Sequence, residues 1–301
     1  MKKIKLIALL LAALIMTVAF TGCGKTDASK TDSDDDRGSH EDNEQIIDPE
    51  NYSEGLEFEL NDDETGYIVT GIGTCEDTEI VIPSKYEGKP VTGIGEDAFR
   101  NCKSLTSVTM LSGVESIGSK AFFYCTNLTS VTIPNGVTVI GDRAFRDCDL
   151  TSVTIPKSVT EIGDFAFADN TSLTSFTIPE GMTEIAEGVF CGCESLTSIT
   201  IPESVTKIGS SAFSGTALTS ITIPEGVTRI GYSTFSYCKS LTSITIPGGV
   251  TLIRDSAFVE CTALTDIYYG GTVAEWEKAA EPYTLSPVPN CTVTCTDGTV
   301  H

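Results

Sequence analysis

Few residues of this 301-residue chain have the types and spacing that catalysis needs. Only two histidines occur, His40 and His301, and both lie in segments that we expect to be poorly ordered. Histidine is the commonest general base and a frequent zinc ligand, so its scarcity argues against a hydrolase or a metalloenzyme. Serine is abundant, but no G-x-S-x-G sequence places one on a nucleophile elbow. An enzyme that uses carboxylates is the least favoured alternative, and we expect no catalytic residue, no metal and no cofactor.

Cysteine is the other reactive side chain, and eleven copies occur. Setting Cys23 aside leaves ten, an even number that in an exported protein suggests disulfide bridges. Six of them share one position of a repeat: Cys102, Cys125, Cys148, Cys193, Cys238 and Cys261. Asn170 and Thr216 occupy that position in two other units, and small polar replacements favour small buried thiols over a bridge framework. We therefore predict free, buried thiols at this position.

Acidic side chains outnumber basic ones by 42 to 19, which gives a formal net charge of −23. This charge argues against nucleic-acid binding, because clustered lysine and arginine are needed to hold a phosphate backbone. The acidity is concentrated in residues 24–64, which hold sixteen Asp and Glu against three basic residues. The first thirty of these residues contain few apolar side chains, so we predict an acidic disordered tether over residues 23–53.

The first residues of the chain indicate export. Three lysines precede an apolar run from Leu6 to Phe20, which is short for a membrane-spanning helix but fits a secretory signal over residues 1–22. The sequence F-T-G-C that ends at Cys23 resembles a bacterial lipobox, although phenylalanine replaces the more usual leucine. That resemblance implies a lipid on Cys23 and attachment to the bacterial cell membrane or outer surface. The alternative is an ordinary signal peptide with a coincidental cysteine.

From Leu105 onward the chain repeats every 22 or 23 residues with the pattern L-T-S-V/I-T-I-P-x-G/S-V-T-x-I-G-x-x-A-F-x-x-C. Alternating apolar and hydroxyl residues predict a half-buried strand that ends at the proline, and V-T-x-I predicts a second short extended piece. The A-F segment is too short for an ordinary helix, so we expect one turn of α- or 3₁₀-helix there. One phenylalanine recurs in every complete unit, which predicts a stacked column: Phe122, Phe145, Phe167, Phe190, Phe213, Phe235 and Phe258.

A single unit buries too little apolar surface to fold alone, so the units must stabilise one another as a solenoid. We expect a mostly β repeat solenoid with a parallel sheet, short helical turns and a cap at each end. The N-terminal cap and an atypical first repeat occupy residues 54–104, with strands over 56–60 and 67–69. The repeats proper occupy residues 105–263. The C-terminal cap occupies residues 264–301, with helical character over 273–280 and a last strand over 292–294.

These residues resemble the BspA-like class of leucine-rich repeats over about residues 79–267. The pattern recurs seven times, and departures such as Ala186 and Arg254 in place of glycine are small. The resemblance implies a curved solenoid on a bacterial surface, often used for adhesion or for binding proteins of host or neighbouring cells. It does not imply an enzyme.

Two columns of outward hydroxyls on the first strand of each unit form the candidate binding face. Its members are Ser107, Thr109, Ser130, Thr132, Ser152, Thr154, Ser175, Thr177, Ser198, Thr200, Ser220, Thr222, Ser243 and Thr245. They could be β-favouring, solvated residues that pair across strands. They could instead contact a surface or extracellular protein, or a glycan. An ice-binding surface is a third, less favoured possibility.

The sequence therefore predicts a monomeric, lipid-anchored surface protein that acts as a protein-binding or adhesion module. The alternative is a structural envelope lipoprotein without a dedicated ligand. Among the aromatic residues at the end of the repeats, Tyr268, Tyr269 and Trp276 suggest either packing in the cap or a platform that stacks on sugars, and we favour packing.

Overall fold

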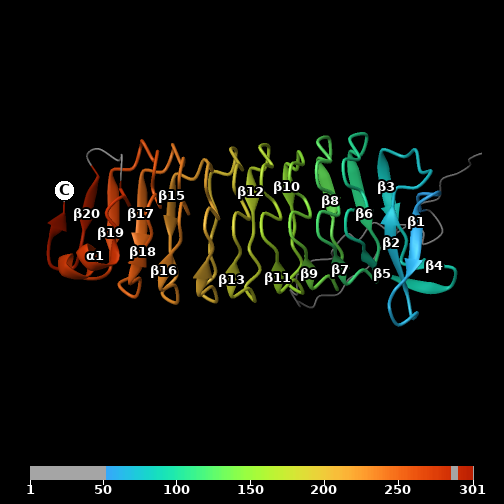
Figure 1. The fold of residues 1–301 in the computed structure, drawn as a ribbon, viewed down its shortest axis with the longest axis horizontal. Helices are drawn as coiled ribbons and strands as arrows, with labels where there is room; N and C mark the ends of the chain where they lie inside the picture. Colours follow the sequence, from blue (N-terminus) through green and yellow to red (C-terminus); the bar gives the residue numbers. More distant parts are fainter. Residues whose placement is uncertain (1–51, 286–290, 301) are drawn as a thin grey trace, which may run out of the picture. The chain divides into compact units, whose positions relative to one another are not determined.

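A computed structural model describes residues 52–285 and 291–300, which belong to one compact unit (Figure 1). The expected signal peptide, Cys23 and most of the expected tether lie outside the described residues. The described chain is a β-solenoid in which each unit forms one coil, and most coils contribute one strand to each of two rows. The only helix of the described residues is α1 (Val273–Ala279), so the predicted repeat solenoid is confirmed.

The first strand row carries the L-T-S-V/I-T-I segments, and its strands pair in parallel with equivalent residues side by side. Ser107 lies opposite Ser130, and Ser220 lies opposite Ser243. The row comprises β3 (Glu79–Ile82), β6 (Ser107–Met110), β8 (Ser130–Thr132), β10 (Ser152–Val153), β12 (Ser175–Phe176), β15 (Ser220–Thr222), β17 (Ser243–Ile246), β19 (Asp266–Tyr269) and β20 (Thr292–Thr294). The row is not one sheet, because pairing stops between β8 and β10 and between β12 and β15.

The second strand row carries the V-T-x-I segments that follow the proline. It comprises β5 (Lys89–Ile94), β7 (Ser116–Ile117), β9 (Val139–Ile140), β11 (Glu161–Ile162), β13 (Glu184–Ile185), β14 (Lys207–Ile208), β16 (Arg229–Ile230) and β18 (Leu252–Ile253). Its strands also pair in parallel, but pairing stops between β11 and β13 and between β14 and β16. The second extended piece expected in each unit is therefore present, although it is only two residues long in most coils.

Stacked phenylalanines fill the core between the two rows, as the repeat predicts. The rings of Phe99 and Phe122 lie 5.0 Å apart and within 3° of parallel, and those of Phe122 and Phe145 lie 5.1 Å apart. Phe99 extends the column into the atypical first repeat. Offset stacking at this distance adds about 0.5–1.5 kcal/mol per pair to the effect of burial. The phenylalanine rings thus form a column that runs through the core along the solenoid axis.

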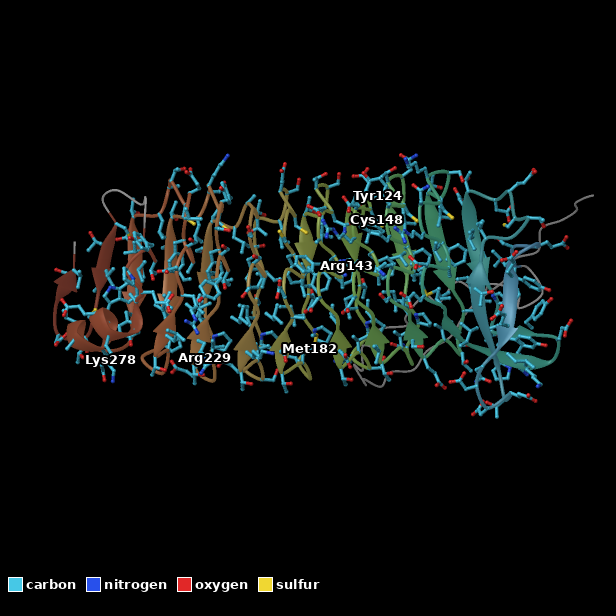
Figure 2. All side chains as sticks on the ribbon, in the orientation of Figure 1. Tyr124, Arg143, Cys148, Met182, Arg229 and Lys278 are labelled. Carbon is cyan, nitrogen blue, oxygen red and sulfur yellow. The ribbon has the colours of Figure 1, made fainter. Side chains whose placement is uncertain are left out.

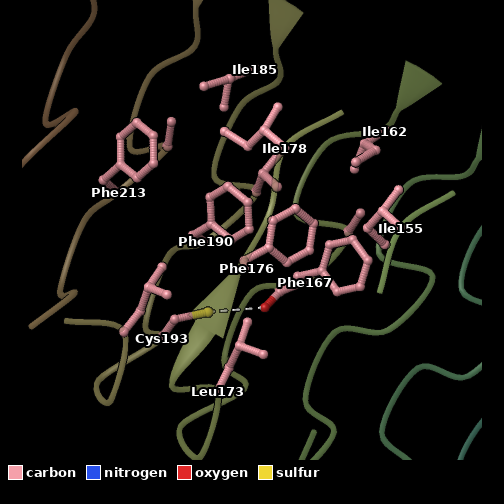
Figure 3. Packing of buried hydrophobic residues seen from close by; sticks show 14 of the residues in the cluster. Ile155, Ile162, Phe167, Leu173, Phe176, Ile178, Ile185, Phe190, Cys193 and Phe213 are labelled. Atoms are coloured by element: carbon pink, nitrogen blue, oxygen red, sulfur yellow. Dashed lines mark hydrogen bonds between the residues drawn. The ribbon is translucent and has the colours of Figure 1, made fainter. Parts of the chain in front are cut away.

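The column has one fault, at the step from Phe167 to Phe190. Here Phe176, which replaces the usual Val or Ile of the first strand row, inserts its ring between the two (Figure 3). Its centroid lies 5.0 Å from Phe167 and 4.7 Å from Phe190, at 63° and 68° to their planes. The expectation that every phenylalanine stacks directly on the next is therefore wrong at this step, because a third ring occupies the space.

Ala186 lies at the same fault, in a column otherwise made mostly of glycine. An added Cβ on Gly141 would lie 2.6 Å from the backbone nitrogen of Ser119, so glycine lets the coils approach closely there. The amide of Gly141 then donates to Ile117 O at 2.8 Å, and no equivalent bond joins Ala186 to Ile162 among the described residues. An apolar cavity of about 10 Å³ lies at this step and is lined by Phe176, Ile185 and Phe190, among others. The missing bond is not explained by the loss of glycine alone, because Arg254 donates to Ile230 O at 3.0 Å.

The A-F segment is not a helical turn, so that expectation is wrong. Each phenylalanine amide donates to a carbonyl of the next coil, as from Phe122 to Ala144 O at 2.8 Å, which gives the solenoid a third hydrogen-bonded ladder. Residues two before and two after each phenylalanine have positive φ, which prevents a helix. Even bulky residues adopt this conformation: φ is 65° at Tyr124 and 56° at Phe165. The ladder between coils is what holds them there.

Both ends are capped by strands that continue the rows. At the N-terminus, β1 (Glu57–Leu60) pairs antiparallel with β2 (Tyr67–Gly71), and β2 joins β5. A further short strand of the atypical first repeat, β4 (Lys85–Tyr86), pairs antiparallel with β5. At the C-terminus, Thr272 and Glu275 form a capping box that starts α1. The expected helix and the strand over 292–294 are confirmed, and β21 (Thr299–Val300) adds an antiparallel strand that we did not anticipate.

Candidate binding face

The first strand row places both hydroxyl columns on its outer side, because successive residues of a strand point to opposite faces. Val131 and Ile133 point inward and are buried, while Ser130 and Thr132 between them are exposed. Three members of the columns, Ser107, Thr109 and Ser243, are half-buried, and the others are exposed. Where the strands pair, the members lie in register. We call these two columns the hydroxyl face.

The hydroxyls of this face point to solvent without partners. Within the described residues, no side-chain hydrogen bond involves any member of either column, and none is buried without a partner. They therefore do not pair with one another across the strands. Ser198 and Thr200 lie in a segment that forms no strand, so the hydroxyl face has no strand pairing at this unit of the solenoid.

A neighbouring column of threonines behaves in the opposite way and was missed by sequence reasoning. Thr129 Oγ1 donates to Thr106 O at 3.2 Å, and Thr242 Oγ1 donates to Thr219 O at 3.0 Å. The second row has its own example, since Thr138 Oγ1 donates to Glu115 O at 3.2 Å. These hydroxyls bind one coil to the previous one. The threonine that follows the leucine of every unit was the available signal.

The hydroxyl face ends at Tyr268, which takes the place of threonine in its column. Tyr268 pairs with Thr245 on one side and with Thr294 on the other, and its side chain is 47% exposed. Its neighbour Tyr269 points inward, where its hydroxyl donates to Val250 O at 3.0 Å and its ring lies 5.5 Å from buried Trp276. Packing in the cap is thus confirmed for Tyr269 and Trp276, whereas Tyr268 remains on the surface.

The repeat cysteines lie beside the aromatic column, and all but Cys102 are buried. All ten described cysteines are free, as predicted for the repeat positions. Cys193 Sγ donates to Phe167 O at 3.3 Å (Figure 3), and Cys125 Sγ donates to Phe99 O at 3.0 Å. Burial raises the pKa of Cys125 to about 12 and that of Cys148 well above its ordinary value. Such thiols are neutral and therefore poor nucleophiles.

The described residues offer little to carboxylate chemistry or metal binding. Arg146 lies 3.3 Å from Asp147 and 3.0 Å from Asp169. Burial, followed by the charge of Asp169, raises the pKa of Asp147, and Arg146 opposes this shift. The arrangement is a surface ion-pair network, and no group of three potential metal ligands occurs in the described part of the chain.

A surface depression of about 560 Å³ lies over the second strand row. Arg229, labelled in Figure 2, lines it with Lys207 and Tyr232. Its charges are largely compensated, since Lys207 pairs with Glu184, and Arg254 pairs with Glu281 at 2.7 Å while lying over the Tyr232 ring. Within the described residues, no helix has the length and apolar character needed to cross a bilayer.

Known proteins share this repeat architecture. A family model described as BspA type leucine-rich repeat region matches residues 92–193 and 160–280, with six copies. A leucine-rich repeat protein from T. pallidum is 28% identical over 70% of this chain and 88% of its own, with a TM-score of 0.50. A leucine-rich repeat protein from Bacteroides ovatus ATCC 8483 is 28% identical over 72% of this chain and 70% of its own, with a TM-score of 0.48. No curated protein matches the chain.

Proposed function

Because the chain belongs to the family of BspA type leucine-rich repeat regions, we propose that it is a surface-displayed module that binds another protein through its hydroxyl face. The proposal assigns the chain no catalytic reaction and treats it as a monomer. It also includes export and a lipid on Cys23, so that the acidic residues 24–53 hold the solenoid away from the membrane. The N-terminal sequence supports that part of the proposal.

One observation carries the binding role. The hydroxyl face presents exposed donors and acceptors that the described residues leave unpartnered, at the spacing of parallel strands, about 4.8 Å. A partner can satisfy these groups without breaking any hydrogen bond of the solenoid. Each coil contributes little, and the contacts add along the array.

The test compares two matched sets of lysine substitutions in the full chain. The first set, Thr132→Lys, Thr154→Lys and Thr177→Lys, places charge on exposed members of the hydroxyl face. The second set, Ser116→Lys, Thr183→Lys and Thr228→Lys, adds the same charge to exposed residues of the second strand row. Crosslinking on intact cells followed by mass spectrometry identifies partners that the wild-type chain captures.

We expect the first set to abolish capture of a defined partner and the second set to preserve it. Circular dichroism confirms that both sets fold. Partners that bind all three chains equally would show that the hydroxyl face is not the site. The complete lack of partners would favour a structural envelope lipoprotein. Separately, Cys23→Ser should prevent metabolic labelling by an alkyne fatty acid if Cys23 carries the lipid.

A further inference from the structure

A groove of about 300 Å³ lies at the C-terminal end of the hydroxyl face. Tyr268 lines it together with Thr222, Thr245, Thr294 and Glu225. It therefore lies where the repeated strands meet the cap and where the hydroxyl column is interrupted by an aromatic ring. Its volume is at the lower end of the range for small-molecule sites.

Departures from the repeat lie beside this groove. The position after the proline holds Asn135, Lys157 or Glu225 in other coils but glycine at Gly248. An added Cβ on Gly248 would lie 2.8 Å from Gly270 O, and one on Gly270 would lie 2.8 Å from the Gly248 nitrogen. The two backbones approach so closely that side chains are excluded from both positions. Pro247 and Gly270 therefore line the groove beside the exposed Tyr268 ring without a long side chain between them.

The polar groups of the groove are available for a ligand. Within the described residues, the hydroxyls of Thr222, Thr245, Thr294 and Tyr268 make no side-chain hydrogen bond, and the Glu225 carboxylate has no ion pair. These groups accept and donate hydrogen bonds around a flat, half-exposed ring. An aromatic ring beside hydroxyls and one carboxylate suits a molecule with an apolar face and hydroxyl edges.

We propose that this groove binds a neutral sugar, with the ring of Tyr268 stacked on the carbon–hydrogen face of the sugar. Glu225 and the threonine hydroxyls would bind the sugar hydroxyls. This inference deepens the proposed function, because it adds a glycan contact to the hydroxyl face on which that function rests. The bound sugar would be the terminal residue of a glycan carried by the partner protein. The rest of that glycan would extend along the threonine column of the hydroxyl face.

The charges around the groove select against acidic ligands. Glu225 is the only ionisable acid or base, other than Tyr268, Tyr269 and Cys295, among the groove residues, so no cation is present to hold a carboxylate or a phosphate. The chain as a whole carries a formal net charge of −23, which repels anions at long range. A neutral sugar avoids both penalties.

The test is saturation-transfer NMR and a titration of the full chain with glucose, galactose, mannose and N-acetylglucosamine and with their short neutral oligomers. We expect at least one sugar of this panel to bind, and Tyr268→Thr to weaken its binding by about tenfold or more. Threonine is the residue that the column holds elsewhere, so this variant preserves the fold. Tyr268→Phe keeps the ring and should retain most of the affinity.

Tyr232→Ser is the matched control, because Tyr232 is also exposed and serine occupies its repeat position at Ser119 and Ser210. Binding that survives Tyr268→Thr, binding that is lost in Tyr232→Ser, or the failure of every sugar in the panel would overturn the inference. None of these results affects the lysine test of the hydroxyl face. The two proposals therefore fail separately.

Discussion

The coils from Phe99 to Phe167 and the step from Phe167 to Phe190 are built from the same repeat, yet they pack differently. In the first stretch, each ring stacks directly on the next, and glycines such as Gly141 bring the backbones into hydrogen-bonding contact. At the fault, Phe176 separates the rings, and Ala186 lacks the corresponding backbone bond. Direct stacking of the rings is therefore lost where a third ring, Phe176, lies between them. The backbone bond does not require glycine, because the amide of Arg254, at the same repeat position, donates to Ile230 O at 3.0 Å.

The difference matters because stability in a solenoid comes largely from contacts between neighbouring coils. Fewer contacts at one step make that step the place where the array separates first. The fault is thus one weaker joint of the array, and strand pairing also stops between β8 and β10 and between β14 and β16.

The largest expected effect is in the phenylalanine column itself. Phe145→Ala should lower the free energy of unfolding by about 3–5 kcal/mol, since the ring is fully buried between two stacked neighbours. Phe176→Ala should cost clearly less, because Phe167 and Phe190 can then move together and fill the space. Urea denaturation followed by circular dichroism measures both. An equal or larger cost for Phe176→Ala would contradict the description of Phe176 as a wedge.

An intermediate effect is expected from restoring the repeat at the fault. Phe176→Ile alone leaves part of the wedge space empty, and Ala186→Gly alone adds backbone freedom that costs about 0.5–1 kcal/mol. Together they should let the coils close, so the double variant should be more stable than the sum of the single changes by about 1 kcal/mol or more. A double-mutant cycle with urea measures this coupling.

Ala274→Gly provides the control for that cycle. Ala274 is exposed on α1, far along the chain from Phe176, so its combination with Phe176→Ile should be additive. Additive behaviour of Ala186→Gly as well would show that Phe176 and Ala186 do not act together.

The smallest expected effect concerns single threonine hydroxyls. Thr138→Val should cost about 0.5–1.5 kcal/mol, because it removes the hydrogen bond to Glu115 O. Thr183→Val should change stability by less than about 0.5 kcal/mol, because Thr183 occupies the same column at the fault and its hydroxyl has no partner among the described residues. Thermal unfolding compares the two, and a similar cost for both would mean that the coils do close at the fault.

Much of this fold could be predicted from the sequence, because periodicity marks the features that every coil shares. The strand before each proline, the buried phenylalanine and the free cysteines all follow from one repeated pattern. The cap helix follows from local signals around Trp276. The hydroxyl face could be placed on the outside because strand alternation fixes which residues point inward.

The remaining features depend on single departures from the pattern or on contacts between coils. The left-handed residues could not be foreseen, since side chains as different as Tyr124, Phe165 and Ser211 adopt that conformation. Ala186 and Arg254 are similar departures from glycine in the sequence, yet only Arg254 keeps the backbone bond to the previous coil. The groove proposed to bind a sugar lies where Gly248 and Gly270 meet across adjacent coils, a contact that periodicity does not predict.

The ladder formed by the phenylalanine amides gives the solenoid a direction. Each of these N–H groups donates to the coil that follows it, and at the C-terminal end Thr284 O accepts the N–H of Phe258 at 3.3 Å, next to the bond from Ser256 N to Tyr283 O. A chain without Tyr283 and Thr284 would leave the Phe258 N–H without its acceptor at this end of the ladder. An edge with unpaired N–H groups favours pairing with another strand, so the C-terminal cap covers an edge that would otherwise be open to a further coil.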